Sequence, residues 1–345
     1  MTAGTGKLKP SPTRACAPSQ RHGKSTVFVM LRTVLANVRY FLWFAMALVL
    51  PWPAAAQTSV GQGVPALRVI APNGASSVLI GSLHIAATRL QQPDASVMNG
   101  AKRYVVESST TQGPQPTALP LDLAPEVIHR LLATKGVTRA DWAAGLTEAH
   151  LKTFREYLGC AAPGVNLDEV AGVLLSIKTA RYASEIASHP CPPAGLLSRD
   201  VILEHAAVER GVRMFILESQ VDVEARRRAI PERIYRDQIY RAFTPEWHKG
   251  LRRVVNALNT GNYDAITDVQ SELFANPADA EVLRKTMVVE RNHEWLPVLT
   301  GYLDEGAAVV NVGAAHLPGP DGLIALLREG GYRVESIQLP VWSAH

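Results

Sequence analysis

Residues 311–322 have the sequence NVGAAHLPGPDG. An apolar run, Ala307–Val310, precedes it, and an amphipathic run, Leu323–Glu329, follows it. The first run predicts a buried strand and the second predicts a helix. His316 therefore lies just beyond a strand end. We expect Gly313, which precedes it, to permit a sharp turn that aims the histidine into a cleft.

A glycine, two further residues and a histidine follow an apolar run at two places in the chain. GSLH, which ends at His84, follows VLI, and GAAH, which ends at His316, follows VVNV. Two glutamates, Glu107 and Glu218, likewise follow the apolar runs YVV and FIL. In open α/β sheets, ligands bind outside the carboxyl ends of the strands. We therefore expect the two histidines and the two glutamates to share one cleft.

These residue types suit two kinds of chemistry. Two imidazoles and a carboxylate can hold a divalent metal that keeps an open position. They equally suit metal-free hydrolysis, in which a histidine activates water and a glutamate orients it. A single histidine is more often a structural residue, and only two positions of each motif are fixed. The chain has no G-x-S-x-G elbow, no Walker loop and no H-E-x-x-H motif.

Arg291 and Asn292 interrupt the helical run MVVERNHEW. One interpretation places them on a solvated face that forms surface salt bridges. The other places Arg291 inside the fold, where it would hold a substrate carboxylate or an active-site glutamate.

Composition and charge exclude a nucleic-acid function. Of 345 residues, 47% are hydrophobic, 19% charged and 6% aromatic, which is typical of a globular protein with few rings for base stacking. Seven of the 35 Lys and Arg residues lie in residues 1–56, which hold no Asp or Glu. The rest of the chain has 28 basic and 31 acidic residues, so the net charge of +4 becomes −3 without the leader. The basic character belongs to the leader and not to a binding surface.

Residues 1–56 are predicted to be a targeting leader. Basic Arg32 and Arg39 precede the apolar run FLWFAMALVL, and a small-residue site ends at Ala56. The run is shorter than the about 20 residues of a membrane span. We expect cleavage near Ala56 and export of residues 57–345 as one domain, with contact to the membrane only through the leader. Met30 would give a more compact leader, and an uncleaved N-terminal membrane anchor is the alternative.

Two cysteines, Cys160 and Cys191, follow the leader. In an oxidising compartment they could form a disulfide around one helix, or remain as two thiols, and the sequence leaves both open. Their spacing is not that of a C-x-x-C zinc or redox site.

The remaining pattern predicts an α/β domain. LRVIA and SSVLIGSLH flank an Asn-Gly turn and predict a β-hairpin, and RYVVESS, VRMFILESQ and YRVESIQL predict further strands. Helices are expected near residues 125–135, 139–158, 167–188 and 278–304, and after an N-cap at Ser198. Strands thus cluster near 67–107, 212–218 and 307–340, with two helical blocks between them. One sheet assembled from distant segments, with two helical insertions, accounts for this order.

Several of these segments resemble the TraB/GumN family, which includes the Tiki-type metalloproteases and is distantly related to erythromycin esterases and haem-binding ChaN proteins. The resemblance rests on VLIGSLHIA, YVVESS, FILESQ, VVERNHEWLP and NVGAAHLPGPDGLIALLREGGYRVE. It spans about residues 75–338 and implies a mixed central sheet with helical insertions. Ser82 stands where the family usually has threonine, which keeps the hydroxyl, and Ser219-Gln220 departs from the usual context after Glu218.

By this resemblance, His84, Glu107 and His316 would hold the metal, which is manganese or cobalt in the Tiki-like proteases; zinc would suit the same ligands. Glu107, Glu218, Arg291 and Asn292 would be the catalytic and supporting residues. The leading hypothesis is an exported metal-dependent hydrolase of a peptide or another amide or ester. The alternatives are a metal-free His/Glu esterase and a binder of metal, haem or a signalling peptide without turnover. Substrate and oligomeric state stay open.

Overall fold

The computed structural model describes residues 63–108 and 138–342, all within the unit Ser59–His345. The predicted leader, the cleavage site near Ala56 and the helix near 125–135 lie outside these residues, so they stay predictions. In the described part, no helix is both long enough and apolar enough to cross a bilayer.

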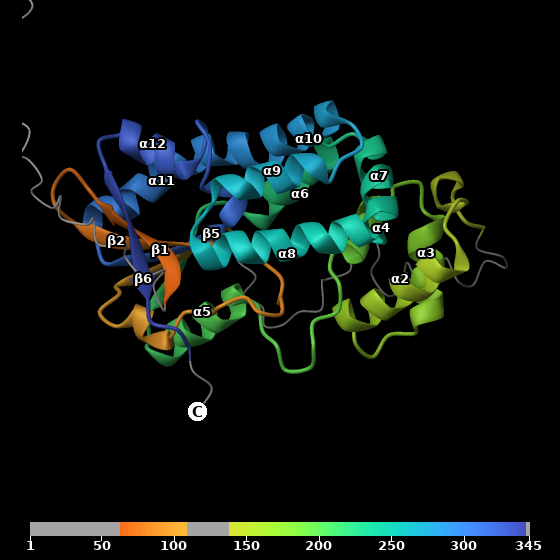
Figure 1. The fold of residues 1–345 in the computed structure, drawn as a ribbon, viewed down its shortest axis with the longest axis horizontal. Coiled ribbons are helices and arrows are strands. Elements are labelled where there is room, and N and C mark those ends of the chain that lie inside the picture. Colours follow the sequence, from red (N-terminus) through yellow and green to blue (C-terminus); the bar gives the residue numbers. More distant parts are fainter. Residues whose placement is uncertain (1–62, 109–137, 343–345) are drawn as a thin grey trace, which may run out of the picture. The chain divides into compact units, whose positions relative to one another are not determined.

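The described chain contains a six-stranded mixed sheet, which lies toward the left in Figure 1. Its strands run in the order β4-β3-β5-β2-β1-β6. The four strands β2, β5, β3 and β4 are parallel neighbours, whereas β1 is antiparallel to both β2 and β6. The bounds are β1 Val64–Ile70, β2 Ser76–Ser82, β3 Arg103–Val106, β4 Arg213–Ile216, β5 Ala308–Gly313 and β6 Arg333–Leu339. The predicted α/β class and the assembly of the sheet from distant segments are confirmed.

The predicted hairpin is β1 and β2, which pair from Leu67 with Leu79 to Ile70 with Ser76. The Asn73 side chain accepts a hydrogen bond from the Ala75 amide, 2.9 Å away, and so stabilises the turn. Gly74 adopts a left-handed conformation with φ +86°, which explains why glycine follows asparagine here.

Helices occupy the two intervals between β3 and β4 and between β4 and β5. The first interval holds α2 Glu148–Ala161, α3 Leu167–Ser176, α4 Arg181–Ala187 and α5 Arg199–Glu209. The second holds α6 Gln220–Ala229, α7 Glu232–Ala242, α8 Pro245–Thr260, α9 Asp264–Glu272, α10 Pro277–Arg284 and α11 Glu290–Glu305. Short elements are the 3-10 helices Ala95–Met98, Asp141–Ala143 and Ala314–His316, and α12 Leu323–Glu329 lies between β5 and β6.

Apolar side chains gather in three clusters. One joins the sheet to α8, α9, α11 and α12, and a smaller one joins the other face of the sheet to α5. The third contains no strand and joins α2, α3 and α4 to α7 (Figure 1). The two helical blocks, separate in sequence, therefore share one helical core beside the sheet.

The prediction of a single helix over 167–188 is wrong. The segment forms two helices, α3 and α4. Thr179 Oγ1 donates to Glu232, 2.9 Å away, and the Ala180 amide donates to the other oxygen of the same carboxylate at 2.5 Å. The Ile177 carbonyl accepts from Trp142 Nε1 at 2.9 Å. These contacts with distant segments replace the hydrogen bonds that would have continued the helix.

Two further helix predictions need correction. The segment 139–158 contains a 3-10 turn, and α2 begins only at Glu148, where Thr147 caps it by accepting from the His150 amide. The long helix over 278–304 is present as α10 and α11, but a π-helical turn, Lys285–Val289, joins them. Such turns are frequent at functional sites, and this one directly precedes Arg291.

Cys160 and Cys191 form a disulfide with a Cα–Cα distance of 5.6 Å, which settles the alternative that the sequence left open. It ties α2 to the chain after α4. The enclosed segment contains both α3 and α4 rather than the one helix expected.

Removal of this disulfide should destabilise the helical core. Closing a loop of about 30 residues restricts the unfolded chain by about 3–4 kcal/mol in the loop-entropy model. The variant with Cys160→Ser and Cys191→Ser should therefore have a clearly lower midpoint of urea unfolding than the oxidised wild type. Circular dichroism measures both midpoints. Wild-type protein in reductant should match the variant. Equal midpoints for the oxidised wild type and the variant would contradict the prediction.

Candidate functional site

Four parallel strands end at one edge of the sheet, and a predicted site residue follows each of them. His84 follows β2, Glu107 follows β3, Glu218 follows β4 and His316 follows β5. Because β2, β5, β3 and β4 are parallel neighbours, their carboxyl ends lie together. Three of the four residues, His84, Glu107 and His316, line one cavity as expected, whereas Glu218 lies outside its lining and pairs with Arg291.

Glu107 lies at the centre of the site, with its side chain only 12% exposed. Its Oε1 atom is 3.2 Å from His84 Nε2 and 3.7 Å from His316 Nε2, and it accepts from the Gly313 amide at 2.5 Å. Its Oε2 atom accepts from Arg291 Nη2 at 2.6 Å. Burial alone would raise the pKa of Glu107, but the charges of His84 and Arg291 outweigh it and hold the pKa well below its usual value.

Arg291 is buried and uses all five of its N–H groups. Nε donates to Glu218 at 2.8 Å, and Nη1 donates to the Met287 carbonyl at 2.9 Å and to His316 Nε2 at 3.1 Å. Nη2 donates to Glu107 and to Glu218. The inward position considered for this residue is correct. No N–H of Arg291 is therefore left to donate to a further group.

Glu218 and Asn292 support this arrangement from behind the cavity. Glu218 is 7% exposed and accepts from two nitrogens of Arg291, so it positions the guanidinium. Asn292 is fully buried, and its Nδ2 donates to the carbonyls of His316 and Asp321 at 3.1 and 2.7 Å.

His316 is fixed in its neutral form. Arg291 donates to its Nε2, so the ring proton resides on Nδ1 and is donated to Asn292 Oδ1, 2.7 Å away. Burial, with the nearby positive charge of Arg291, lowers the pKa of His316 to about 3, although Glu107 acts in the opposite direction. His316 is therefore uncharged at neutral pH and serves as an acceptor for Arg291.

His84 lies between two carboxylates and opens onto the cavity, with 47% of its side chain exposed. Its Nδ1 is 3.1 Å from Asp200 Oδ1, and its Nε2 faces Glu107. Burial would lower the pKa of His84, but the negative charges of Asp200 and Glu107 raise it well above 6.5. Its backbone is left-handed with φ +62°, and the Ser82 hydroxyl accepts from its amide at 3.2 Å.

Asp200 is the site residue that sequence analysis missed. It lies in the first turn of α5 and accepts from Ser82 Oγ at 2.5 Å and from Asn311 Nδ2 at 2.9 Å, besides its contact with His84. Its sequence context predicts only a favourable charge near a helix start. The usable signal was Asn311, a polar residue inside the apolar run VVNV.

Gly313 has a different role from the one expected. Its φ of −54° and ψ of 132° are open to any residue, so the turn does not require glycine. A Cβ there would lie 2.6 Å from His84 Nε2 and 3.0 Å from Glu107 Oε1. Gly313 is needed because these two side chains fill the space above it.

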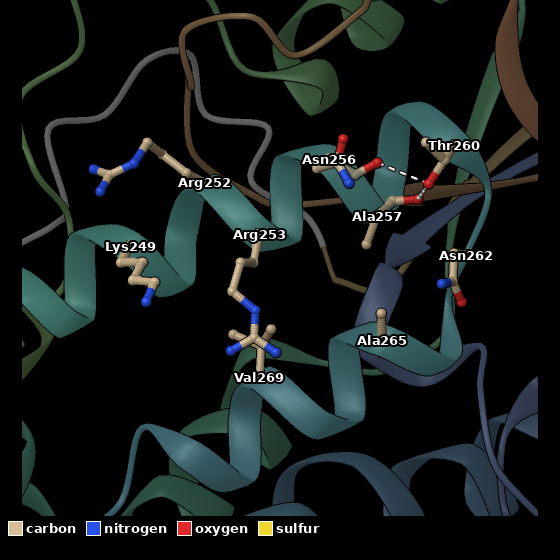
Figure 2. A pocket seen from close by; sticks show the side chains of 9 residues that line it. All are labelled: Lys249, Arg252, Arg253, Asn256, Ala257, Thr260, Asn262, Ala265 and Val269. Carbon is tan, nitrogen blue, oxygen red and sulfur yellow. Dashed lines mark hydrogen bonds between the residues drawn. The ribbon is translucent and has the colours of Figure 1, made fainter.

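A cavity of about 680 Å³ opens over these residues and extends between the helices. His84, Glu107, Arg291 and His316 line it, and its size is that of a small-molecule site. A smaller hollow of about 380 Å³ lies over α8 and α9 (Figure 2). It has no acidic or imidazole side chain in its lining, and its Arg253 is paired with Glu272, so we place the chemistry in the larger cavity.

The three predicted metal ligands do not form a metal site as they stand. His316 Nε2 is occupied by Arg291, and no group of three or more His, Cys, Asp or Glu in the described ranges is arranged to hold a metal. Two donors, His84 Nε2 and Glu107 Oε1, face the cavity 3.2 Å apart. The other imidazole nitrogen of His84 is held by Asp200, as is usual for a metal-bound histidine. His84 and Glu107 therefore fit a divalent cation as a pair of ligands, whereas the predicted set of three, which includes His316, does not.

The model of the TraB/PrgY/gumN family matches residues 66–336. The chain belongs to the TraB/PrgY/gumN family. The matched residues extend from β1 to β6 and include all residues of the site. The candidate site therefore lies within the part of the chain that the family model matches. Searches among curated proteins and among solved structures gave no match.

The two site histidines should titrate very differently in metal-free protein. His84 should lose its ring proton with a midpoint above pH 6.5, because two carboxylates stabilise the imidazolium. His316 should stay neutral down to about pH 4, since its pKa is about 3. Nitrogen-15 NMR of the imidazoles measures both. Asp200→Asn should lower the midpoint of His84, and a His84 midpoint at or below 6.5 in the wild type would refute this electrostatic account.

Proposed function

We propose that this TraB/PrgY/gumN protein is an exported hydrolase of amide or ester bonds, with His84 as the proton acceptor. One observation carries the proposal: the His84 imidazole is held by Asp200 at Nδ1 and presents Nε2 to Glu107 and to a cavity of about 680 Å³. An imidazole oriented by a carboxylate and facing a substrate cavity is the arrangement that general acid–base catalysis requires.

In this proposal, the neutral form of His84 takes a proton from water at Nε2. Glu107 Oε1, 3.2 Å from that nitrogen, orients the water. The water oxygen bonds to the acyl carbon, the bond to the leaving alcohol or amine breaks, and His84 returns the proton to the leaving group. The buried charge of Arg291 stabilises the oxyanion. Because the pKa of His84 is raised, activity should increase as pH rises through a value above 6.5.

A metal-assisted form of the same hydrolysis is the second candidate, because His84 Nε2 and Glu107 Oε1 together face the cavity. Manganese, cobalt or zinc bound there would supply a Lewis acid and a more acidic water. Asp200 would then fix the His84 ring as an outer partner.

Export is part of the proposal and is supported by two independent features. Residues 1–56 have the basic, apolar and small-residue order of a signal peptide. The Cys160–Cys191 disulfide is a bond that persists in oxidising compartments such as the periplasm.

The proposed hydrolysis can be tested by assaying protein that starts at Gln57 against a library of esters and peptides. His84→Ala should lower kcat/KM by about 10²–10⁴-fold, the usual contribution of a general base. Glu107→Gln should also abolish most turnover, whereas a protein that only binds its ligand should keep its affinity in this variant. His205→Ala removes an exposed histidine of α5 and is the matched control.

The same assay decides between the two forms of the mechanism. The metal-free form is supported if activity survives a chelator and elemental analysis finds no metal in the protein. Loss with chelator and recovery with manganese, cobalt or zinc supports the metal-assisted form. Full activity of the variant with His84→Ala and His316→Ala would rule out both.

A further inference from the structure

The cavity continues from the catalytic edge into an apolar lobe among the helices. Met287 lies one helical turn before Arg291, and its carbonyl accepts from that guanidinium at 2.9 Å, so the lobe begins beside the catalytic residues. The lobe walls are partly buried apolar side chains from α8, the end of α9, α10 and the π-helical turn: Leu251, Leu273, Phe274, Leu283 and Met287.

Four of the charged residues that line the cavity form two ion pairs. Arg227 Nη1 lies 3.2 Å from Glu185 Oε1, and Arg284 Nε donates to Glu281 Oε2 at 2.8 Å. Because each of these four charges has a partner on the protein, none of them is left unpaired to recognise a charged ligand.

The five apolar side chains that form the walls carry no strong hydrogen-bonding group, although Thr267, Gln270 and Ser271 also line the cavity. A peptide segment would bring an N–H and a C=O with every residue, and each unpaired group costs free energy when it leaves water. An alkyl chain brings none, and gains from burial about 0.8 kcal/mol per methylene.

We propose that the preferred substrates are esters or amides whose acyl part is an extended alkyl chain. The chain lies in the lobe between Leu251 and Met287, and the scissile carbonyl lies at His84 and Glu107. This inference names the substrate class of the proposed hydrolase and therefore rests on that function. Hydrolysis releases the fatty acid, with the water oxygen on its carboxyl group, and the free alcohol or amine.

A chain-length series tests the inference. With p-nitrophenyl esters, kcat/KM should be at least tenfold higher for decanoyl than for butanoyl, because six more methylenes are buried. Met287→Gln keeps the length of the side chain but makes the wall polar, and should reduce this ratio at least fivefold. Val298→Thr makes a similar polar change at an exposed position of α11 outside the lobe, and should leave the ratio unchanged.

Binding of decanoate and butanoate by calorimetry separates this inference from the proposed function. Tighter binding of decanoate, weakened by Met287→Gln and not by Val298→Thr, supports the lobe even if no ester is hydrolysed. Equal hydrolysis of all chain lengths, with equal binding of both acids, would overturn the lobe while leaving the hydrolase intact. A preference for apolar peptides over decanoyl esters would likewise overturn the acyl-chain inference.

Discussion

The site depends on the buried guanidinium of Arg291, which connects three strand ends. It donates to Glu107 after β3, to Glu218 after β4 and to His316 after β5. A buried cation is tolerated only where carboxylates and acceptors surround it, and here two carboxylates do so. The positive charge of Arg291 adds to that of His84 in lowering the pKa of Glu107 and adds to burial in lowering the pKa of His316 to about 3, whereas the pKa of His84 is raised.

The sheet order explains why residues so distant in sequence meet. Glu107 and Arg291 are separated by 184 positions, yet β3 and β5 are hydrogen-bonded neighbours and α11 packs on the sheet. The helical blocks contribute the other half of the arrangement. They share one core and contribute most of the residues that border the cavity. The candidate site at the sheet edge and most of the cavity wall are thus supplied by different parts of the chain.

Sequence alone was sufficient for much of this site. Apolar runs that end in a histidine or a glutamate have one natural location, the carboxyl edge of a parallel sheet, so His84, Glu107, Glu218 and His316 were placed together correctly. The sheet strands followed from the same runs. The split of the segment 167–188 did not, because it depends on Glu232, which lies far along the chain. Asp200 was missed for the same reason, since it lies in α5 and its partners Ser82 and Asn311 lie in the distant strands β2 and β5.

A crystal structure with an alkyl phosphonate, whose tetrahedral phosphorus resembles the intermediate of ester hydrolysis, would test the proposed hydrolytic role of His84 and Glu107. The account predicts a phosphonyl oxygen within hydrogen-bond distance of His84 Nε2, beside Glu107, with Arg291 still bound to both glutamates. A phosphonate bound instead in the basic hollow near Lys249 and Arg252, with the His84 edge empty, would contradict it.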